Sequence, residues 1–209
     1  MITTIQQIQS FKANGLEHFL VMIMVRGQQV YDGVWQSKKT ITIDPRPEDP
    51  ENLPDLLKGF GAVPPLVTDI DLSLDDKYLY VACWGLGEMH QYDVSDPMNP
   101  VLNGKVQLGG IATEHKHPNG KEVIYGPQMV EISRDGKRVY WTNSLYSSWD
   151  NQFYPHQEGG QMVMANVGED GSFALDPDFY IDFPENTRAH QIRLEGGDCS
   201  TDSFCYPSV

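Results

Sequence analysis

Residues 72–85 read LSLDDKYLYVACWG, and residues 132–145 repeat the same plan as ISRDGKRVYWTNSL. The two stretches align at an offset of 60, which places Ser73 on Ser133 and keeps an Asp, a Lys and a Tyr in step. In each copy, a segment in which apolar and polar residues alternate precedes the Ser, and a second such segment follows the Lys. Such period-2 segments around a short polar link predict a β-hairpin, written twice along the chain.

The residues between the two segments of each copy are turn formers. Asp75 and Asp135 can each accept hydrogen bonds from the local backbone, and Gly136 can supply a positive φ. A pair of carboxylates could also serve as acid and base in catalysis. Because these two recur at the same position of a repeated turn, we expect them to shape the hairpins.

Each copy continues with two more predicted strands, which are separated by turn-forming residues. The sequence therefore predicts four-stranded antiparallel meanders over residues 66–109 and 128–183, superposable with Ser73 on Ser133. A repeat of about sixty residues made of four strands is typical of a β-propeller blade. Dividing 209 residues by 60 gives about three and a half blades, so the prediction is an all-β, partial β-propeller over residues 27–209.

Three segments do not fit the repeat. Residues 111–126 and 145–160 are insertions, which we expect at one face of the propeller, where binding sites are commonly built. Residues 1–26 form a separate N-terminal segment, for which we expect a helix and then an apolar strand at FLVMIMV, residues 19–25. That run is too short to span a membrane as a helix and has no basic flank of a signal peptide.

Composition limits the classes of function. The chain has 209 residues, 40% of them apolar, and a net charge of −14. It should fold, and its negative charge opposes binding to nucleic acids and to anionic membrane surfaces. Three cysteines, Cys83, Cys199 and Cys205, do not indicate a disulfide framework, although a Cys199–Cys205 bridge can form.

Longer stretches resemble a known family. PPLVTDIDLSLDDKYLYVACWG, QYDVSDPMNPVLNG, GPQMVEISRDGKRVYWTNSLYSSWDNQFYP and HQIRLEGGDCSTDS are similar to the C-terminal half of the selenium-binding protein family, which includes methanethiol oxidases. The resemblance covers about residues 31–206. It implies a seven-bladed propeller and a copper-dependent oxidase that converts methanethiol, dioxygen and water to formaldehyde, hydrogen sulfide and hydrogen peroxide.

The resemblance also implies that part of the site lies elsewhere. Family members are longer, and their N-terminal halves carry the cysteine associated with selenium binding and several histidines suited to copper. We therefore expect a fragment with an altered start that has little oxidase activity alone and self-associates through open propeller edges. The expected location is the cytoplasm, or the periplasm for a full-length bacterial relative.

Histidines are the candidate copper ligands, since imidazole suits this metal. His190, in the family's C-terminal motif, is the first candidate, weighed against a role as a buried structural histidine. His115 and His117 form an H-x-H pair in a loop, where solvent exposure is the usual outcome. His90 is expected on a solvated face. No catalytic residue is assigned.

Other residues are assigned from their local pattern. Cys83 is expected in the core and Cys199 in a structural role. Aromatic residues on the strands are expected to pack between blades, and three residues of the second insertion to face a site: Tyr146, Trp149 and Asp150. Besides the oxidase, two readings stay open: a non-catalytic propeller that binds selenium or a protein, and a reading frame without function.

Overall fold

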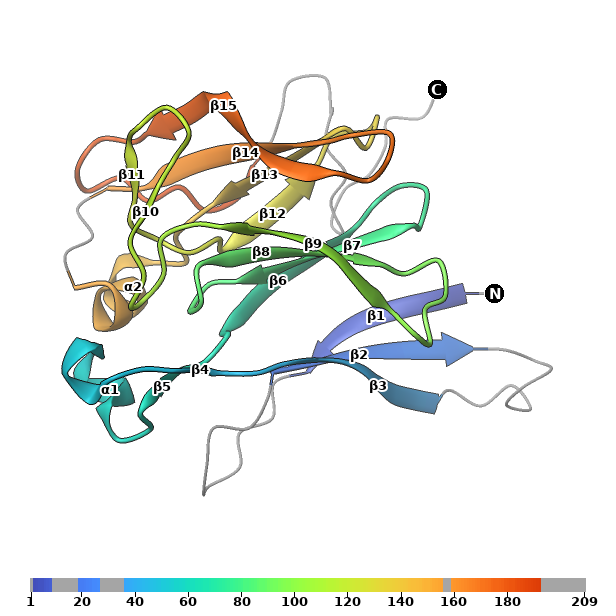
Figure 1. Cartoon of the computed structure of the whole chain (residues 1–209), viewed down its shortest axis with the longest axis horizontal. Coiled ribbons are helices and arrows are strands. Elements are labelled where there is room, and N and C mark those ends of the chain that lie inside the picture. Colours follow the sequence, from blue (N-terminus) through green and yellow to red (C-terminus); the bar gives the residue numbers. More distant parts are fainter. Residues whose placement is uncertain (1, 9–18, 27–35, 156–158, 193–209) are drawn as a thin grey trace.

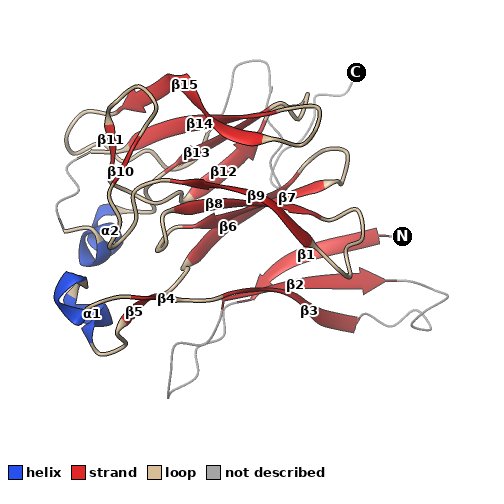
Figure 2. Ribbon diagram, viewed as in Figure 1, coloured by secondary structure: helices blue, strands red, loops and turns tan. Residues whose placement is uncertain are grey.

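The structure is a computed structural model that describes residues 2–8, 19–26, 36–155 and 159–192. In these ranges the chain is all-β, with antiparallel sheets and a few short helices gathered at one end (Figures 1 and 2). None of the described helices is long and apolar enough to cross a membrane.

Two four-stranded sheets form the centre of the molecule. The first meander consists of β6 (Val67–Leu72), β7 (Tyr78–Cys83), β8 (Glu88–Asp93) and β9 (Val101–Gln107). The second meander consists of β12 (Met129–Ile132), β13 (Arg138–Thr142), β14 (Gln161–Val167) and β15 (Phe173–Asp182). In both sheets the strand order follows the chain, so the two predicted meanders are confirmed.

The repeated Ser-x-Asp segments close the first hairpin of each meander. The hydroxyl of Ser73 donates a hydrogen bond to Asp75 at 2.6 Å, and the hydroxyl of Ser133 donates one to Asp135 at 2.5 Å. Gly136 has a φ of +70°, which L-residues seldom adopt. The turn chemistry predicted from the repeat is confirmed.

Smaller elements surround the meanders. A three-stranded sheet contains β1 (Ile2–Ile8), β2 (Phe19–Arg26) and β3 (Gln36–Ile43). The helix expected in the N-terminal segment is wrong for β1, because these residues pair with β2 along their whole length. The chain continues through β4 (Arg46–Pro47), the 3-10 helix η1 (Pro50–Asn52), α1 (Asp55–Lys58) and β5 (Ala62–Val63).

Strand β7 shows how the core is built on both sides of the first meander. Leu79 and Val81 belong to a buried cluster with Ile41 of β3, whereas Tyr80 and Ala82 face the second meander. Side chains of a strand alternate between its faces, so one strand serves two interfaces. The second meander contributes its own buried residues to this shared core: Val130, Ile132, Val139, Trp141, Val163 and Ala165.

The two meanders point the same way. The hydroxyl of Thr68 on β6 donates a hydrogen bond to the carbonyl of Gln128 at 2.8 Å, just before β12. At the far end, Asn103 on β9 donates one to the carbonyl of Gly171 in the β14–β15 turn at 2.8 Å. The β6–β7, β8–β9, β12–β13 and β14–β15 turns therefore lie at one end, and the insertions after β9 and β13 lie at the other, which we call the loop end.

Candidate functional site

The loop end is built by connections from both meanders. The insertion after β9 forms the hairpin of β10 (His115–Lys116) and β11 (Glu122–Val123), and the insertion after β13 forms α2 (Ser147–Phe153). Figure 1 shows these elements, with α1, on the same side of the molecule. The expectation that both insertions reach one face is confirmed. The chain after β15 returns to the same end and carries His190.

His190 is exposed and anchored by its backbone and its ring. Ring atom Nδ1 lies 2.9 Å from the carbonyl oxygen of Ser144, and the hydroxyl of Thr142 donates a hydrogen bond to the His190 carbonyl. Because a carbonyl oxygen only accepts, Nδ1 carries the proton in the neutral ring. The lone pair of the imidazole is then on Nε2.

Ser144 is itself held by α2. Its hydroxyl donates a hydrogen bond to the carboxylate of Asp150, which also accepts one from the backbone N–H of Leu145 at 3.2 Å. Asp150 has no exposed surface, and burial raises the pKa of its carboxyl group. Asp150 was expected to face a site, but its side chain is buried and holds Ser144, whose carbonyl contacts His190. Tyr146 and Trp149 of the same insertion are exposed.

The expectation that His117 is exposed to solvent in a loop is wrong, because the residue is buried. Only 2% of it is exposed, and its ring packs edge-on against Tyr180 of β15 at 5.2 Å. Nδ1 accepts a hydrogen bond from the backbone N–H of Asn119 at 3.3 Å, which places the proton of the neutral ring on Nε2. His117 lies in the turn of the β10–β11 hairpin, and this turn packs against Tyr180 through both His117 and Lys121.

The three candidate histidines have different surroundings. His190 contacts Ser144 at the end of β13, His117 contacts Tyr180, and His115 is half-buried in β10. Among the described residues, no group of three or more histidine, cysteine or acidic side chains is placed to hold a metal ion.

The expectation of a solvated His90 is wrong. His90 is 5% exposed, and its Nε2 lies 2.7 Å from Glu88, whose other oxygen accepts from Lys105 at 2.9 Å. Tyr92, on the same face of β8, belongs to the core cluster that includes Ile41. This face is buried, and the ring of His90 is satisfied by its hydrogen bond with Glu88. Burial acts to raise the pKa of Glu88, but the hydrogen bonds from His90 and Lys105 outweigh it and set the pKa at about 2.

Cys83 and the strand aromatics are part of the core. Cys83 is fully buried, and burial raises the pKa of its thiol well above the ordinary value. Trp84 packs at 5.4 Å from Phe153 and donates a hydrogen bond to the carbonyl of Asn143 at 3.2 Å, so it joins the two meanders. Cys199 and Cys205 lie outside the described residues.

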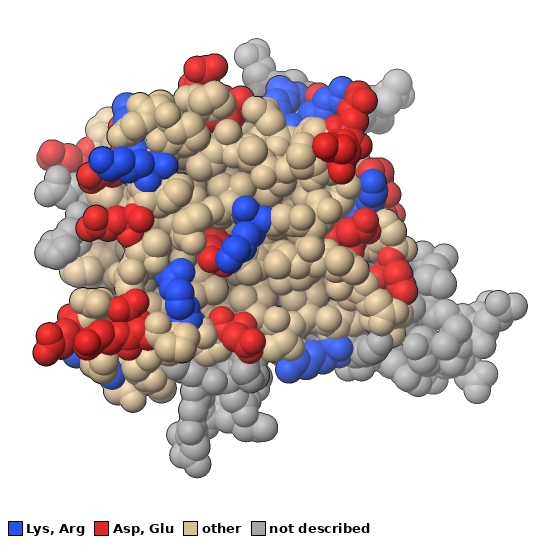
Figure 3. All heavy atoms as spheres, in the orientation of Figure 1, with Lys and Arg blue, Asp and Glu red and all other residues tan. Residues whose placement is uncertain are grey.

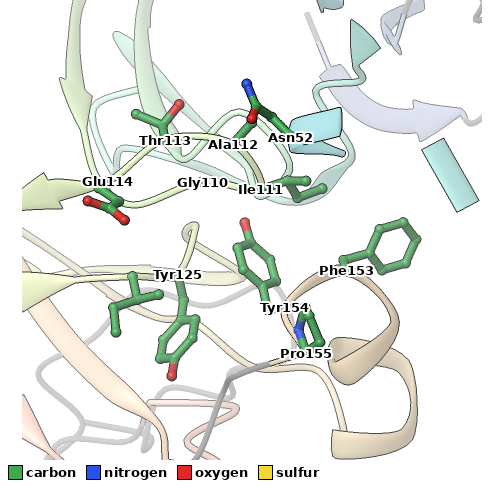
Figure 4. Close-up of a pocket in the computed structure, with 11 residues that line it drawn as sticks. Asn52, Gly110, Ile111, Ala112, Thr113, Glu114, Tyr125, Phe153, Tyr154 and Pro155 are labelled. Atoms are coloured by element: carbon green, nitrogen blue, oxygen red, sulfur yellow. The ribbon is translucent and has the colours of Figure 1, made fainter. Parts of the chain in front are cut away.

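A cavity of about 520 Å³ opens at the loop end beside α2. Figure 4 shows the loop of residues 110–114 on one side and the aromatic rings of Tyr125, Phe153 and Tyr154 on the other. The lining is completed by Asn52, Ile124 and Pro155. The cavity could not be predicted from the sequence, because its walls come from four segments that only the fold brings together.

Comparisons with known proteins agree with this architecture. The family model "56kDa selenium binding protein" matches residues 12–205. A crystal structure of a hypothetical selenium-binding protein from Sulfolobus tokodaii superposes with a TM-score of 0.82 at 53% identity, covering 91% of this chain and 40% of that one.

Curated relatives match over most of the chain. Methanethiol oxidase of Xenopus tropicalis is 41% identical over 195 residues, covering 82% of this chain and 40% of the relative. The human methanethiol oxidase is 40% identical over 194 residues, covering 81% of this chain and 40% of the relative. Selenium-binding protein 2 of Arabidopsis thaliana is 35% identical over 203 residues, covering 86% of this chain and 40% of the relative. The chain spans about 40% of the length of these relatives.

Proposed function

The chain belongs to the 56 kDa selenium-binding protein family, and from this premise we propose that it carries part of a copper-dependent methanethiol oxidase. In the proposed reaction methanethiol, dioxygen and water yield formaldehyde, hydrogen sulfide and hydrogen peroxide. The names of the animal relatives support an oxidoreductase that acts on a small thiol. Since those relatives are longer, their activity is a proposal for this chain.

The observation that carries the proposal is the arrangement of His190. A metal-binding histidine usually donates its other ring N–H to a carbonyl or carboxylate, which fixes the ring and its tautomer. The contact from Nδ1 of His190 to the Ser144 carbonyl is of this kind, and it leaves the lone pair of Nε2 available to bind a metal. This arrangement supports His190 as one ligand of copper, which would supply redox chemistry with dioxygen when bound.

Ser144 and Asp150 support the ring of His190 from the side of Nδ1. Ser144 holds the tautomer of His190 through its carbonyl, and Asp150 holds Ser144 through its hydroxyl. His117 fits a metal less well, because its Nδ1 is an acceptor and its neutral Nε2 carries the proton. We propose that His190 is a ligand and that the remaining ligands lie outside the described residues. His115 stays a weaker candidate.

We also propose that the two meanders are neighbouring blades of a seven-bladed propeller. Strands β7 and β8 of the first meander are buried on both faces, one packed in a cluster with β3 and one against the second meander, as expected for an internal blade. Exposed apolar residues on the outer strands, Val101, Leu102 and Ile181, would favour self-association of the chain. Sedimentation as a compact monomer at micromolar concentration would contradict the self-association.

The second candidate is a non-catalytic module that binds selenium or a protein. It is favoured by the finding that the described residues do not assemble three metal ligands. Selenium binding would not use Cys83, because a buried thiol with a raised pKa is a poor nucleophile.

Copper titration of the purified chain tests the oxidase proposal. We expect one equivalent to bind to the wild type and to His115→Ala, and His190→Ala to lose it. Asp150→Ala should weaken copper binding about 10-fold or more through the displaced Ser144, whereas Asp150→Asn should largely restore it. We expect little hydrogen peroxide on addition of methanethiol to this chain alone. If His190→Ala binds copper as well as the wild type does, His190 is not a copper ligand. The non-catalytic binding module would then be the better-supported function.

A further inference from the structure

Backbone hydrogen bonds and ring packing hold the walls of the cavity at the loop end. The backbone of Gly110 and that of Thr113 exchange two hydrogen bonds, at 2.8 Å and 3.2 Å, and this closes the loop that presents Ile111 and Ala112. Opposite it, the ring of Tyr154 packs against that of Tyr125 at 5.7 Å and 88°. A binding site formed before its ligand arrives loses little affinity to ordering.

The size and lining of the cavity suit a molecule larger than methanethiol. Its volume of about 520 Å³ lies within the range of small-molecule sites, which are mostly apolar with a few polar groups. Methanethiol has only two atoms besides hydrogen and would leave most of this space empty. His190 and Ser144 are not among the lining residues, so the cavity is a site separate from the proposed copper ligand.

The described lining of the cavity carries a negative charge. Glu114 is the one charged side chain among the described lining residues, and no described basic residue forms an ion pair with it. Arg46 is not a lining residue, but its guanidinium donates hydrogen bonds to the hydroxyl of the lining residue Thr113 and to the carbonyl of Leu86. A ligand with a positive group would meet a carboxylate on one side and aromatic faces on the other.

Acidic residues also flank the side of the cavity formed by Asn52. The Asn52 amide donates a hydrogen bond to Glu48 at 2.8 Å, and the neighbouring acidic residues of this segment are Asp49, Glu51 and Asp55. Figure 3 shows acidic side chains gathered over this region, at the lower left. Lys58 pairs with Asp55 at 2.7 Å and offsets only part of this charge.

We propose that this cavity binds a small organic amine with an apolar or aromatic body. The apolar part would lie between Ile111 and the rings of Tyr125 and Tyr154, and the ammonium group would lie near Glu114. Attraction between a cation and aromatic faces adds to that of the carboxylate. The site is independent of the copper proposal, because it shares no lining residue with His190.

Three probes of similar shape and different charge test the proposal. Phenethylamine, 2-phenylethanol and 3-phenylpropionate are each titrated into the full chain at pH 7 and followed by amide chemical shifts of residues 110–114 and 124–125. We expect the amine to bind most tightly, the alcohol more weakly and the carboxylate least. If the carboxylate binds more tightly than the amine, the cavity is a site for an anion held by Arg46. If all three probes bind with equal affinity, charge does not contribute to recognition. Either result would overturn the proposal.

Two variants locate the site. Ala112→Trp fills the cavity and should abolish binding of the amine, with circular dichroism confirming the fold. Glu114→Gln should weaken the amine about 2- to 5-fold, the range for a partly exposed ion pair, and leave the alcohol unchanged. Glu122→Gln, an exposed glutamate outside the cavity, is the matched control. Retained amine binding in a folded Ala112→Trp chain would overturn the assignment.

Discussion

The hydroxyl of Tyr154 donates a hydrogen bond at 2.5 Å to the backbone carbonyl of Trp84, 70 residues earlier in the chain. The same hydroxyl accepts one from the backbone N–H of Gly126 at 3.2 Å. One buried side chain thereby joins the end of α2 to both the β7–β8 connection and the segment that follows β11. Burial raises the pKa of Tyr154, so the group stays a donor throughout the physiological range.

Tyr154→Phe should destabilise the protein without changing its shape. The substitution leaves the N–H of Gly126 and the carbonyl of Trp84 without this partner, and an unsatisfied buried group costs about 1–3 kcal/mol. Urea denaturation measures the change in the free energy of unfolding. Tyr146→Phe, at an exposed tyrosine of the same insertion, should have almost no effect; equal losses in both variants would contradict the account.

Gly126→Ala should be more damaging still. A Cβ atom at Gly126 would lie 1.9 Å from the carbonyl oxygen of Trp84, a backbone atom that cannot rotate away. We expect a loss of about 3 kcal/mol or more, or failure to fold. Gly59→Ala is the control, because its Cβ would meet nothing within 4 Å and its φ of −68° suits alanine. A stable Gly126→Ala chain would mean that these segments are less tightly packed.

The repeated turns predict opposite effects at equivalent positions. Asp76 has a φ of +57° where the second copy has Gly136 at +70°. Asp76→Gly should therefore stabilise the chain slightly, while Gly136→Asp should destabilise it, each by about 1 kcal/mol. Thermal denaturation of the two single variants checks both signs, and the same sign in both would refute the equivalence of the turns.

Glu88 should contribute an acid-sensitive part of the stability. Its pKa is about 2 in the folded state against an ordinary value of 4.5. A depressed carboxyl pKa stabilises the protein above pH 4.5, and this contribution is lost as the pH falls from 4.5 towards 2. The full contribution is at most about 3 kcal/mol. Glu88→Gln should flatten the dependence of unfolding free energy on pH in that window, whereas Glu169→Gln, at an exposed position, should not.

The meanders could be predicted from the sequence because the contacts that define their turns join residues close together in the chain. Ser73 forms a hydrogen bond with Asp75 within one turn, and Ser133 forms one with Asp135 within the other. The spacing of these residues in the sequence is therefore enough to identify both turns. His90 was misjudged for the opposite reason. Its burial depends on packing against distant residues, since Tyr92 on the same face of β8 shares a core cluster with Ile41 and Ile43 of β3, some fifty residues earlier.

The site was only partly predictable. The family motif identified His190, but its carbonyl partner Ser144 and the support from Asp150 depend on how α2 folds back on β13. The burial of His117 follows from the β10–β11 hairpin, whose strands are two residues each and leave almost no periodic signal. Glu114 and the cavity beside it needed the placement of four distant segments.

The orientation of His190 is the central claim, and the tautomers of the histidine rings test it most directly. A two-bond correlation spectrum of the ¹⁵N-labelled chain above pH 7.5 reports which nitrogen carries the proton. The structure predicts the proton on Nδ1 for His190 and on Nε2 for His117. Addition of substoichiometric Cu²⁺ should broaden the His190 ring signals first. A His190 ring protonated on Nε2, or copper that broadens His117 before His190, would contradict the proposed site.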